Sequence, residues 1–343
     1  MSRSKKQILL VGAGNWGRSW LPLIEQSPVW ELLGVAEPNR GRQQALPRSI
    51  RVFPALDKAL EACSPDAVLL ATPHPIRLEP IRQALRAEAH LLVEKPLATQ
   101  LDEARRIARL ARQSPHCRIM VAQNHRFTDI SGTWQKQLAQ NLLGPLGFLR
   151  IRYLMNIMQH FDFRGTYRDQ TPYNMVLEMA IHHFDLLRWL TGREVRSVYA
   201  KAFQVPWQTI KYDFAINAVL ELDGGTPVEY SANWASPDSL SGWYADWEVG
   251  CAKGFYFCDG LTLQKRVRGK TTELLKERTG LSAARGLILK EFHDALVSDR
   301  QPQCHLWDNL RSLAVCFAVI ASAEKGRPVE LDRILAKMGL KQD

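Results

Sequence analysis

A glycine pattern near the N-terminus constrains this chain more than any other feature. Gly12, Gly14 and Gly17 follow the apolar run at residues 8–11, and a helical pattern follows them. An acidic residue, Glu37, stands 20 residues beyond the last glycine, at the end of a second apolar run. This is the context that the G-x-G-x-x-G fingerprint of dinucleotide-binding βαβ units requires. The pattern therefore predicts a Rossmann-type start to the fold.

Each residue of the fingerprint has an expected role in binding a dinucleotide. Gly12 permits the tight turn, and Gly14 lets backbone N–H groups approach a pyrophosphate. Asn15 and Trp16 open the helix, whose positive N-terminus then faces the phosphates. Gly17 lets the helix pack close to the sheet.

The choice between NAD and NADP depends on the residues around Glu37. A carboxylate there accepts hydrogen bonds from the adenosine ribose and repels a 2′-phosphate, which favours NAD. Arg40 and Arg42 follow at once and can clamp that phosphate, so NADP stays open. An ordinary solvated turn is the simpler explanation of the two arginines.

The first third of the chain alternates short apolar runs with helical patterns. Strands are expected at residues 8–11, 32–37, 52–53, 66–71, 90–93 and 119–122. Helices are expected at residues 15–26, 56–63, 76–87 and from 99 to 111, the last opened by a capping box of Thr99 and Asp102. This alternation predicts a doubly wound parallel sheet with helices on both faces, an α/β Rossmann domain over residues 1–123.

The pattern changes after residue 124. Strands are expected at residues 148–158, 195–203, 214–222, 226–233, 243–249 and 254–257, with a hairpin at Gly224 and Gly225. Helices are expected at residues 132–141, 171–190, 284–297 and 309–325. We expect an α+β domain over residues 124–343 with an open, mainly antiparallel sheet. Its last helices can pack back on the first domain.

A lysine follows the fifth predicted strand, in the sequence Glu94-Lys95-Pro96. In open α/β sheets the carboxyl ends of the strands face the ligand crevice, so Lys95 can point at cofactor and substrate. Pro96 fixes its own φ and biases Lys95 toward an extended conformation. A surface lysine in a loop is the alternative interpretation.

The helix predicted over residues 171–190 begins with Thr171 as N-cap and Pro172 at the first position. It is apolar around its circumference, which predicts burial. Glu178, His182 and Asp185 interrupt it at spacing i, i+4, i+7, which places all three on one face.

Buried carboxylates and imidazoles are costly unless they are paired or face a wet cavity. A histidine one turn from an acid can therefore serve as a general acid or base. The alternative is a structural network in which Glu178 satisfies His182, with His183 on the outside.

Together these residues resemble the family of glucose–fructose oxidoreductase and myo-inositol dehydrogenase. The likeness runs essentially end to end, through residues 12–17, 71–73, 94–96, 124–127, the helix with His182, and the C-terminal helices. The resemblance implies a Rossmann domain, an α+β domain with an open mixed sheet, and a homodimer or homotetramer. It also implies that Lys95 lies near the reacting carbon and that Thr72, Pro73 and His74 line the cofactor crevice.

The chain departs from the family pattern at three positions. The family has Asp-x-x-x-His-x-x-Asp where this chain has Glu178, His182 and Asp185, so His182 takes the catalytic place and the usual substrate is in doubt. Arg77 stands where the family often has histidine, and Glu88 where it often has glycine.

The resemblance implies an NAD(P)-dependent oxidoreductase acting on a secondary alcohol or ketone of a sugar, sugar derivative or cyclitol. In this interpretation His182 removes the hydroxyl proton, Lys95 binds the same oxygen, and Glu178 holds the His182 tautomer. Lys95, Arg126, Glu178 and His182 bind substrate, and Glu94 and Lys95 also face the cofactor. Two alternatives stay open, a non-catalytic NAD(P) sensor and a same-fold imine or bilin-type reductase.

The composition restricts location and partners. The formal net charge is +10, but there is no long Lys/Arg block, so we expect no nucleic-acid partner. No apolar stretch approaches the roughly 18–20 residues that span a bilayer, so no membrane is expected. The six cysteines form no C-x-x-C and no cluster has metal-ligand spacing, which predicts free thiols, no metal and a cytoplasmic protein.

Overall fold

The computed structural model describes residues 5–340 and divides them into two compact units. One unit holds the chain up to Asn124 together with Leu281–Leu310. The other holds His125–Gly280 and the residues from Arg311 onward. The boundary after residue 124 falls where the sequence pattern changes. The C-terminal helical part is divided between the units.

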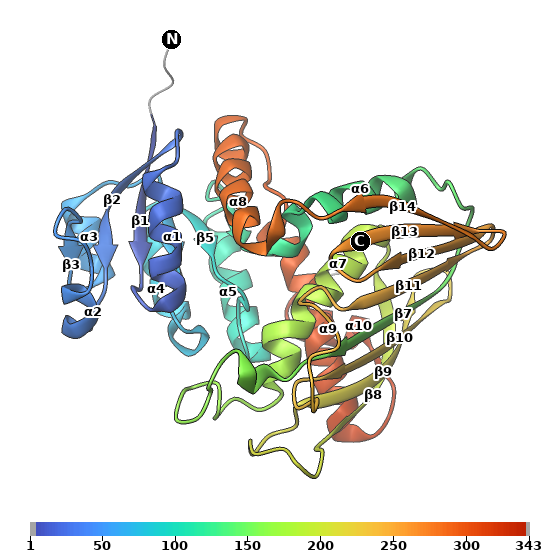
Figure 1. Cartoon of the computed structure of the whole chain (residues 1–343). Coiled ribbons are helices and arrows are strands. Elements are labelled where there is room, and N and C mark those ends of the chain that lie inside the picture. The colour runs from blue at the N-terminus through green and yellow to red at the C-terminus, as the bar shows by residue number, and fades with distance from the viewer. Residues whose placement is uncertain (1–4, 341–343) are drawn as a thin grey trace. The chain divides into compact units, whose positions relative to one another are not determined.

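The first unit is built on a six-stranded parallel sheet in the order β3-β2-β1-β4-β5-β6. Figure 1 labels β3, β2, β1 and β5 of this sheet. This strand order is that of the doubly wound dinucleotide-binding fold, as predicted. The strands are β1 (Lys6–Val11), β2 (Trp30–Ala36), β3 (Val52–Phe53), β4 (Ala67–Leu70), β5 (His90–Val93) and β6 (Ile119–Val121). Strands β1, β4 and β5 are almost entirely buried because helices cover both faces.

The helices of this unit are close to those predicted from the sequence. They are α1 (Asn15–Glu25), α2 (Arg40–Gln44), α3 (Leu56–Ala62), α4 (Leu78–Arg86), α5 (Leu101–Gln113) and α8 (Gly280–Val297). A short 3-10 turn, η1 (His74–Ile76), precedes α4, so the helix expected from residue 76 starts later.

One local prediction about this unit needs adjustment. The capping box of Thr99 and Asp102 was wrong: the Glu103 carboxylate, one residue further along, accepts the Thr99 N–H at 3.2 Å. Helix α8 joins the unit through Trp30, whose ring stacks on Phe292 at 5.7 Å and whose Nε1 donates to the Leu289 carbonyl at 2.9 Å.

The second unit contains a nine-stranded sheet in the order β14-β13-β12-β11-β7-β10-β9-β8-β15. Strands β7 and β10 pair parallel and the other pairs are antiparallel, which confirms a mainly antiparallel sheet. The strands are β7 (Leu146–Leu154), β8 (Val195–Phe203), β9 (Ala215–Leu222), β10 (Thr226–Asn233), β11 (Asp246–Cys251), β12 (Gly254–Cys258), β13 (Thr262–Val267), β14 (Lys270–Lys276) and β15 (Val329–Glu330).

The hairpin between β9 and β10 turns at Gly224 and Gly225, whose φ values of +79° and +77° confirm the predicted signal. The sequence analysis missed β13 and β14. Strand β14 lies at the edge of the sheet and none of its residues is fully buried, so the sequence carries little apolar alternation there.

The remaining helices are α6 (Asp129–Ala139), the π-helical segment η4 (Val176–Ala180), α7 (Ile181–Thr191), α9 (Leu306–Lys325) and α10 (Leu331–Lys337). Helix α6 packs beside α7 and against β13 and β14. Helix α9 is long and apolar enough to cross a membrane by length and composition, which the sequence analysis did not anticipate. Its most apolar window is 67% buried inside the protein, a pattern typical of a core helix.

The helix predicted over residues 171–190 differs at its start. The Thr171 hydroxyl donates to the Tyr167 carbonyl at 2.8 Å, and Tyr173 has φ +54°, so Thr171 and Pro172 do not begin the helix as predicted. The π-helical η4 precedes α7. Its i→i+5 bonds widen the turn, so the α-helical spacing between Glu178 and His182 is not kept. The predicted burial is confirmed, since every residue from 174 to 188 is buried.

Candidate active site

The glycines of the fingerprint form a tight turn between β1 and α1. Gly12 has φ +92°, and a Cβ there would lie 3.1 Å from the Ala71 carbonyl oxygen. A Cβ on Gly17 would lie 1.9 Å from the Gly12 carbonyl oxygen, so glycine alone permits this approach. A Cβ on Gly14 would meet no atom of residues 5–340 within 4 Å, apart from its chain neighbours. This open space beside the first N–H groups of a helix fits a pyrophosphate.

Asn15 and Trp16 are exposed at the start of α1. A guanidinium from α8 covers this part of the helix: Arg285 lies 5.5 Å from the ring centroids of both Trp16 and Trp20. Arg285 also bonds the Ser19 hydroxyl. Sequence analysis missed Arg285, because a residue so far along the chain gives no local signal of this contact.

Glu37 directly follows β2, and its carboxylate is only 2% exposed. Its Oε2 accepts the Ala13 N–H at 2.6 Å and its Oε1 accepts the Asn39 N–H at 2.9 Å. The acid is thus bonded directly to the fingerprint loop. Arg42 lies in α2, which Asn39 caps, and its half-exposed side chain reaches within 3.9 Å of Glu37.

The turn after β4 holds Thr72, Pro73 and His74. Thr72 and His74 are buried and Pro73 is half-buried. The Thr72 hydroxyl is buried without a hydrogen-bond partner within the described chain. A buried hydroxyl without a partner needs a ligand or water to satisfy it. Together with the space above Gly14, it fits a dinucleotide at this edge of the sheet.

The turn after β5 holds Glu94, Lys95 and Pro96. The Glu94 carboxylate accepts the Trp20 indole N–H at 2.8 Å and the Lys95 N–H at 3.2 Å. Lys95 is half-buried, and its peptide bond to Pro96 is cis. Arg77, one of the departures from the family pattern, bonds the backbone carbonyls of this turn.

Gln123 is a further residue that the sequence analysis missed. It follows β6, at the same edge of the sheet as the other two turns, and its side chain is fully buried. Both its amide atoms lack a hydrogen-bond partner among residues 5–340. The sequence did carry a signal for Gln123, because a polar residue directly after a predicted parallel strand lies at the edge of the sheet where ligands bind.

The second unit holds His182, Glu178 and Arg126. The His182 ring packs on His125, with centroids 4.3 Å apart, and His125 Nε2 lies 3.2 Å from the Trp243 carbonyl oxygen. Glu178 is 5% exposed and accepts a hydrogen bond from Arg168 at 3.2 Å. A cation from the preceding loop therefore balances this carboxylate.

His183 is fully buried, so the expectation that it lies outside was wrong. Helix α7 is buried on all sides over residues 181–188, so His183 cannot reach solvent. Nδ1 of His183 lies 2.9 Å from the Tyr230 hydroxyl and Nε2 lies 3.4 Å from the Trp243 carbonyl oxygen. Since the carbonyl only accepts, Nε2 donates to it and Nδ1 accepts from Tyr230. Burial lowers the pKa of His183 to about 3, so the ring is neutral.

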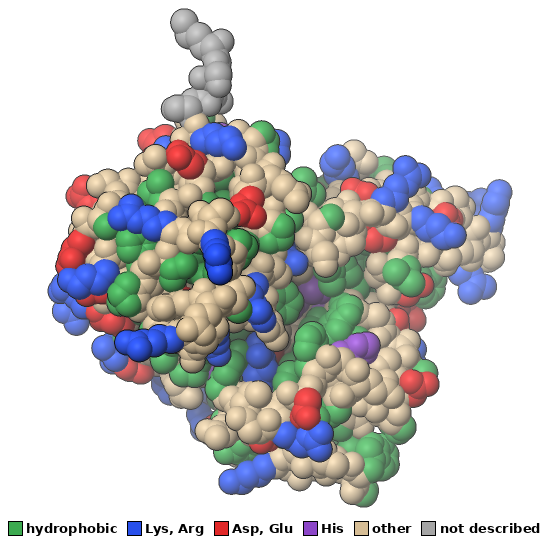
Figure 2. Space-filling view, turned by 60° about the vertical axis from the view of Figure 1, so that its left-hand side comes forward, with side chains coloured by type: hydrophobic (Ala, Val, Ile, Leu, Met, Phe, Trp, Pro, Cys, Tyr) green, Lys and Arg blue, Asp and Glu red, His purple; other side chains and the backbone are tan. Residues whose placement is uncertain are grey.

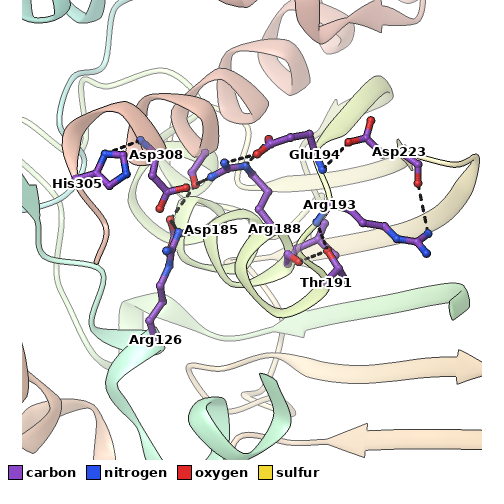
Figure 3. A network of polar contacts seen from close by, with 11 residues as sticks. Arg126, Asp185, Arg188, Thr191, Arg193, Glu194, Asp223, His305 and Asp308 are labelled. Carbon is purple, nitrogen blue, oxygen red and sulfur yellow. Dashed lines mark hydrogen bonds and ion pairs between the residues drawn. The ribbon is translucent and has the colours of Figure 1, made fainter. Parts of the chain in front are cut away.

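Arg126 and Asp185 form a buried bidentate pair, with both N–O distances 2.6 Å (Figure 3). The Ser312 hydroxyl donates to Asp185 at 2.8 Å and accepts from Arg188 at 2.6 Å. Arg188 in turn pairs with Glu194. Asp185 is thus held in a structural network. A substrate-binding role for Arg126 stays a prediction.

Lysine and arginine side chains are interspersed with acidic ones over the face that Figure 2 displays. Across residues 5–340, no group of three His, Cys, Asp or Glu side chains is arranged to hold a metal ion.

Comparison with known proteins links both units to one family. A model described as "Oxidoreductase family, NAD-binding Rossmann fold" matches residues 6–123, and the "GFO/IDH/MocA C-terminal domain" matches residues 133–256. An uncharacterised protein of Sinorhizobium fredii is 24% identical over 96% of each chain. Inositol 2-dehydrogenase of Leifsonia xyli is 31% identical over 55% of each chain.

A solved structure shares the fold over nearly the whole length. The scyllo-inositol dehydrogenase from Lactobacillus casei, with bound NAD(H) and scyllo-inositol, has a TM-score of 0.79 and 17% identity. The match covers 96% of this chain and 99% of that one.

Proposed function

Because the chain belongs to the GFO/IDH/MocA family of NAD-binding oxidoreductases, we propose that it oxidises or reduces a sugar, sugar derivative or cyclitol. The reaction is a hydride transfer between nicotinamide and a secondary alcohol or ketone. Lys95 and His182 are the proposed catalytic pair.

The fingerprint turn is the observation that carries this proposal. The open space at Gly14, the buried Thr72 hydroxyl and the Lys95 turn lie at the carboxyl ends of β1, β4 and β5. These ends form one edge of a parallel sheet, where α/β proteins bind ligands. The inositol dehydrogenases among the relatives support a cyclitol or sugar as substrate.

Each proposed residue has a defined task. NAD, when bound, supplies the hydride chemistry at its nicotinamide. His182 accepts the hydroxyl proton in oxidation and returns it in reduction. Lys95 donates a hydrogen bond to the same oxygen and stabilises its negative charge. Glu178 holds the tautomer of His182, and both Glu178 and Arg126 bind substrate.

Three accompanying features belong to the proposal. NAD is preferred over NADP, because the Glu37 carboxylate repels a 2′-phosphate. The half-exposed Arg42 lies within 3.9 Å of that carboxylate. The protein acts in the cytoplasm, which suits its six free cysteines. It assembles as a homodimer or homotetramer, which light scattering on the purified protein tests directly.

Turnover and binding measured on the same protein test this function. NADH and NADPH are titrated by fluorescence. NAD⁺ and NADP⁺ are then assayed with myo-inositol, scyllo-inositol and a panel of monosaccharides. Lys95→Met and His182→Asn are compared with Lys58→Met and His116→Asn, which change exposed residues of the same types.

We expect the two site variants to lose about 10²–10⁴-fold in kcat, the usual contribution of a general acid–base group, while they still bind NADH. The two control variants keep wild-type kcat. Turnover by either site variant at the wild-type rate would contradict the assigned roles. Reduction of an imine, with no polyol oxidised, would instead favour the alternative reductase.

A further inference from the structure

One buried arginine of the first unit joins two turns that border the predicted cofactor site. The Arg77 side chain is only 4% exposed. Its Nε and Nη2 donate to the Thr72 carbonyl at 3.0 and 2.8 Å. Its Nη1 bonds the carbonyls of Glu94 and Pro96, and Nη2 lies 3.5 Å from the Lys95 carbonyl.

The sheet itself cannot supply these bonds. Strands β4 and β5 pair in parallel as far as Leu70 and Val93, and the Glu94 N–H donates to the Leu70 carbonyl at 2.9 Å. Beyond that bond the two segments of the chain separate, one into the turn with Thr72 and the other into the turn with Lys95. Buried backbone carbonyls are costly without a donor. Arg77 donates hydrogen bonds where the pairing of β4 with β5 ends, and it bonds carbonyls in both turns.

A guanidinium suits this position because of its donor geometry. It carries five N–H donors in a rigid plane, whereas a lysine carries its three donors on a single atom. A lysine would have to bond the Thr72 and Pro96 carbonyls from one nitrogen, whereas Arg77 bonds them from different nitrogens. The Glu94 side chain is fixed separately by Trp20, at 2.8 Å. The backbone on both sides of Lys95 is thus held by groups other than the Lys95 side chain.

We propose that Arg77 is the positioning residue that sets the Lys95 turn against the Thr72 turn for hydride transfer. This inference rests on the proposed function, because it takes Lys95 as the group that binds the reacting oxygen. Arg77 touches neither substrate nor cofactor in this role. A displacement of about 1 Å at a reacting group can cost about 10²-fold in rate, so loss of the clamp should appear mainly in kcat.

The first test uses the labelling of Lys95 and needs no substrate. Wild type, Arg77→Met and Arg77→Lys are acetylated with trace N-hydroxysuccinimidyl acetate, with and without saturating NADH. The Lys95 peptide is then quantified by mass spectrometry. Arg82→Met is the matched control, since Arg82 lies on α4, which begins directly after Arg77, and bonds Glu79 at the surface. Thermal melting and NADH affinity are measured on each variant.

In wild type and Arg82→Met we expect NADH to slow Lys95 labelling at least tenfold. In Arg77→Met and Arg77→Lys the protection falls below threefold, while the NADH dissociation constant changes less than threefold. With a substrate that turns over, Arg77→Met loses about 30–100-fold in kcat. The KM for NAD⁺ stays within threefold.

The outcomes separate the two proposals. If NADH does not protect Lys95 in wild type, the assignment of Lys95 fails, and the role of Arg77 fails with it. If wild type is protected and a folded Arg77→Met is protected equally, the proposed function stands and the positioning role is refuted. If Arg77→Lys behaves as wild type, charge alone suffices and the clamp geometry is refuted. Arg77→Lys retains the cation, so it keeps the test decisive if Arg77→Met does not fold.

Discussion

The same change, glycine to alanine, should lower stability at Gly17 of the fingerprint but leave it nearly unchanged at Gly14. A Cβ on Gly17 would lie 1.9 Å from the Gly12 carbonyl oxygen and 2.8 Å from its carbon. Both atoms are backbone, so α1 must move away from the sheet by about 1.5 Å to restore ordinary contact. Overpacking of this kind typically costs about 1–3 kcal/mol. A Cβ on Gly14 meets open space, and φ −66° suits alanine.

The stability changes follow from these contacts. Inside a helix alanine gains up to about 1 kcal/mol over glycine, which offsets only part of the clash at Gly17. A net loss of about 2 kcal/mol corresponds to a fall in Tm of about 4–8 °C for a unit of this size. At Gly14, alanine lowers the conformational entropy of the unfolded chain and so stabilises the fold by about 0.4–1 kcal/mol. Alanine is also a poorer N-cap than glycine, which offsets this gain, so the Tm should change little.

Thermal unfolding and NADH titration check both variants. We expect Gly14→Ala to keep its Tm within about 3 °C and to lose at least tenfold in NADH affinity, about 1.4 kcal/mol, because the new methyl occupies the phosphate space. Gly17→Ala should lose both stability and affinity. If Gly14→Ala binds NADH as wild type does, the space above Gly14 does not hold the pyrophosphate. If Gly17→Ala melts at the wild-type temperature, the argument from close helix approach is refuted.

Three other substitutions probe single contacts. Arg126→Met leaves the buried Asp185 carboxylate without its bidentate partner and should cost about 3–5 kcal/mol in urea unfolding; a loss below about 1 kcal/mol would contradict this. Burial lowers the pKa of His183 from 6.5 to about 3, so between these values the unfolded chain binds more protons and the free energy of unfolding falls as pH falls. His183→Gln should remove this pH dependence, which amounts to up to about 1.4 kcal/mol per pH unit. The free energy of unfolding is measured by urea titration at pH 7 and pH 5; an equal change between the two pH values in wild type and variant would refute the argument. Glu37→Gln removes the charge that repels a 2′-phosphate, so the ratio of NADPH to NADH affinity should rise at least about fivefold, or about 1 kcal/mol; an unchanged ratio would mean that Glu37 does not set the preference.

The sequence was most informative where a signal is local. The fingerprint, the alternating strands of the first unit and the Gly224-Gly225 turn follow from short-range backbone geometry, and the structure has them as predicted. It was least informative where local preference and tertiary context disagree. Thr171 and Pro172 have the composition of a helix start, yet Tyr173 adopts φ +54° and the π-helical turn follows.

Side-chain partners required the tertiary structure. Asp185 has the spacing of a catalytic face but pairs with Arg126 from another element, and His183 is enclosed between Tyr230 and Trp243. No periodicity along one helix reports what packs against it from distant strands and helices.

The sequence by itself determined that this chain forms a dinucleotide-binding sheet, with Glu37 at the end of β2 and Lys95 just beyond β5. The positions of Glu37 and Lys95 follow from the alternation of strands along the chain. The fingerprint glycines point to one tight turn, because that backbone geometry requires glycine. Only the tertiary structure decided that Arg77 joins the turns after β4 and β5, and that Arg285 covers the start of α1. A long cationic side chain can reach many carbonyls or rings. Which ones it meets is set by the packing of elements far apart in the chain.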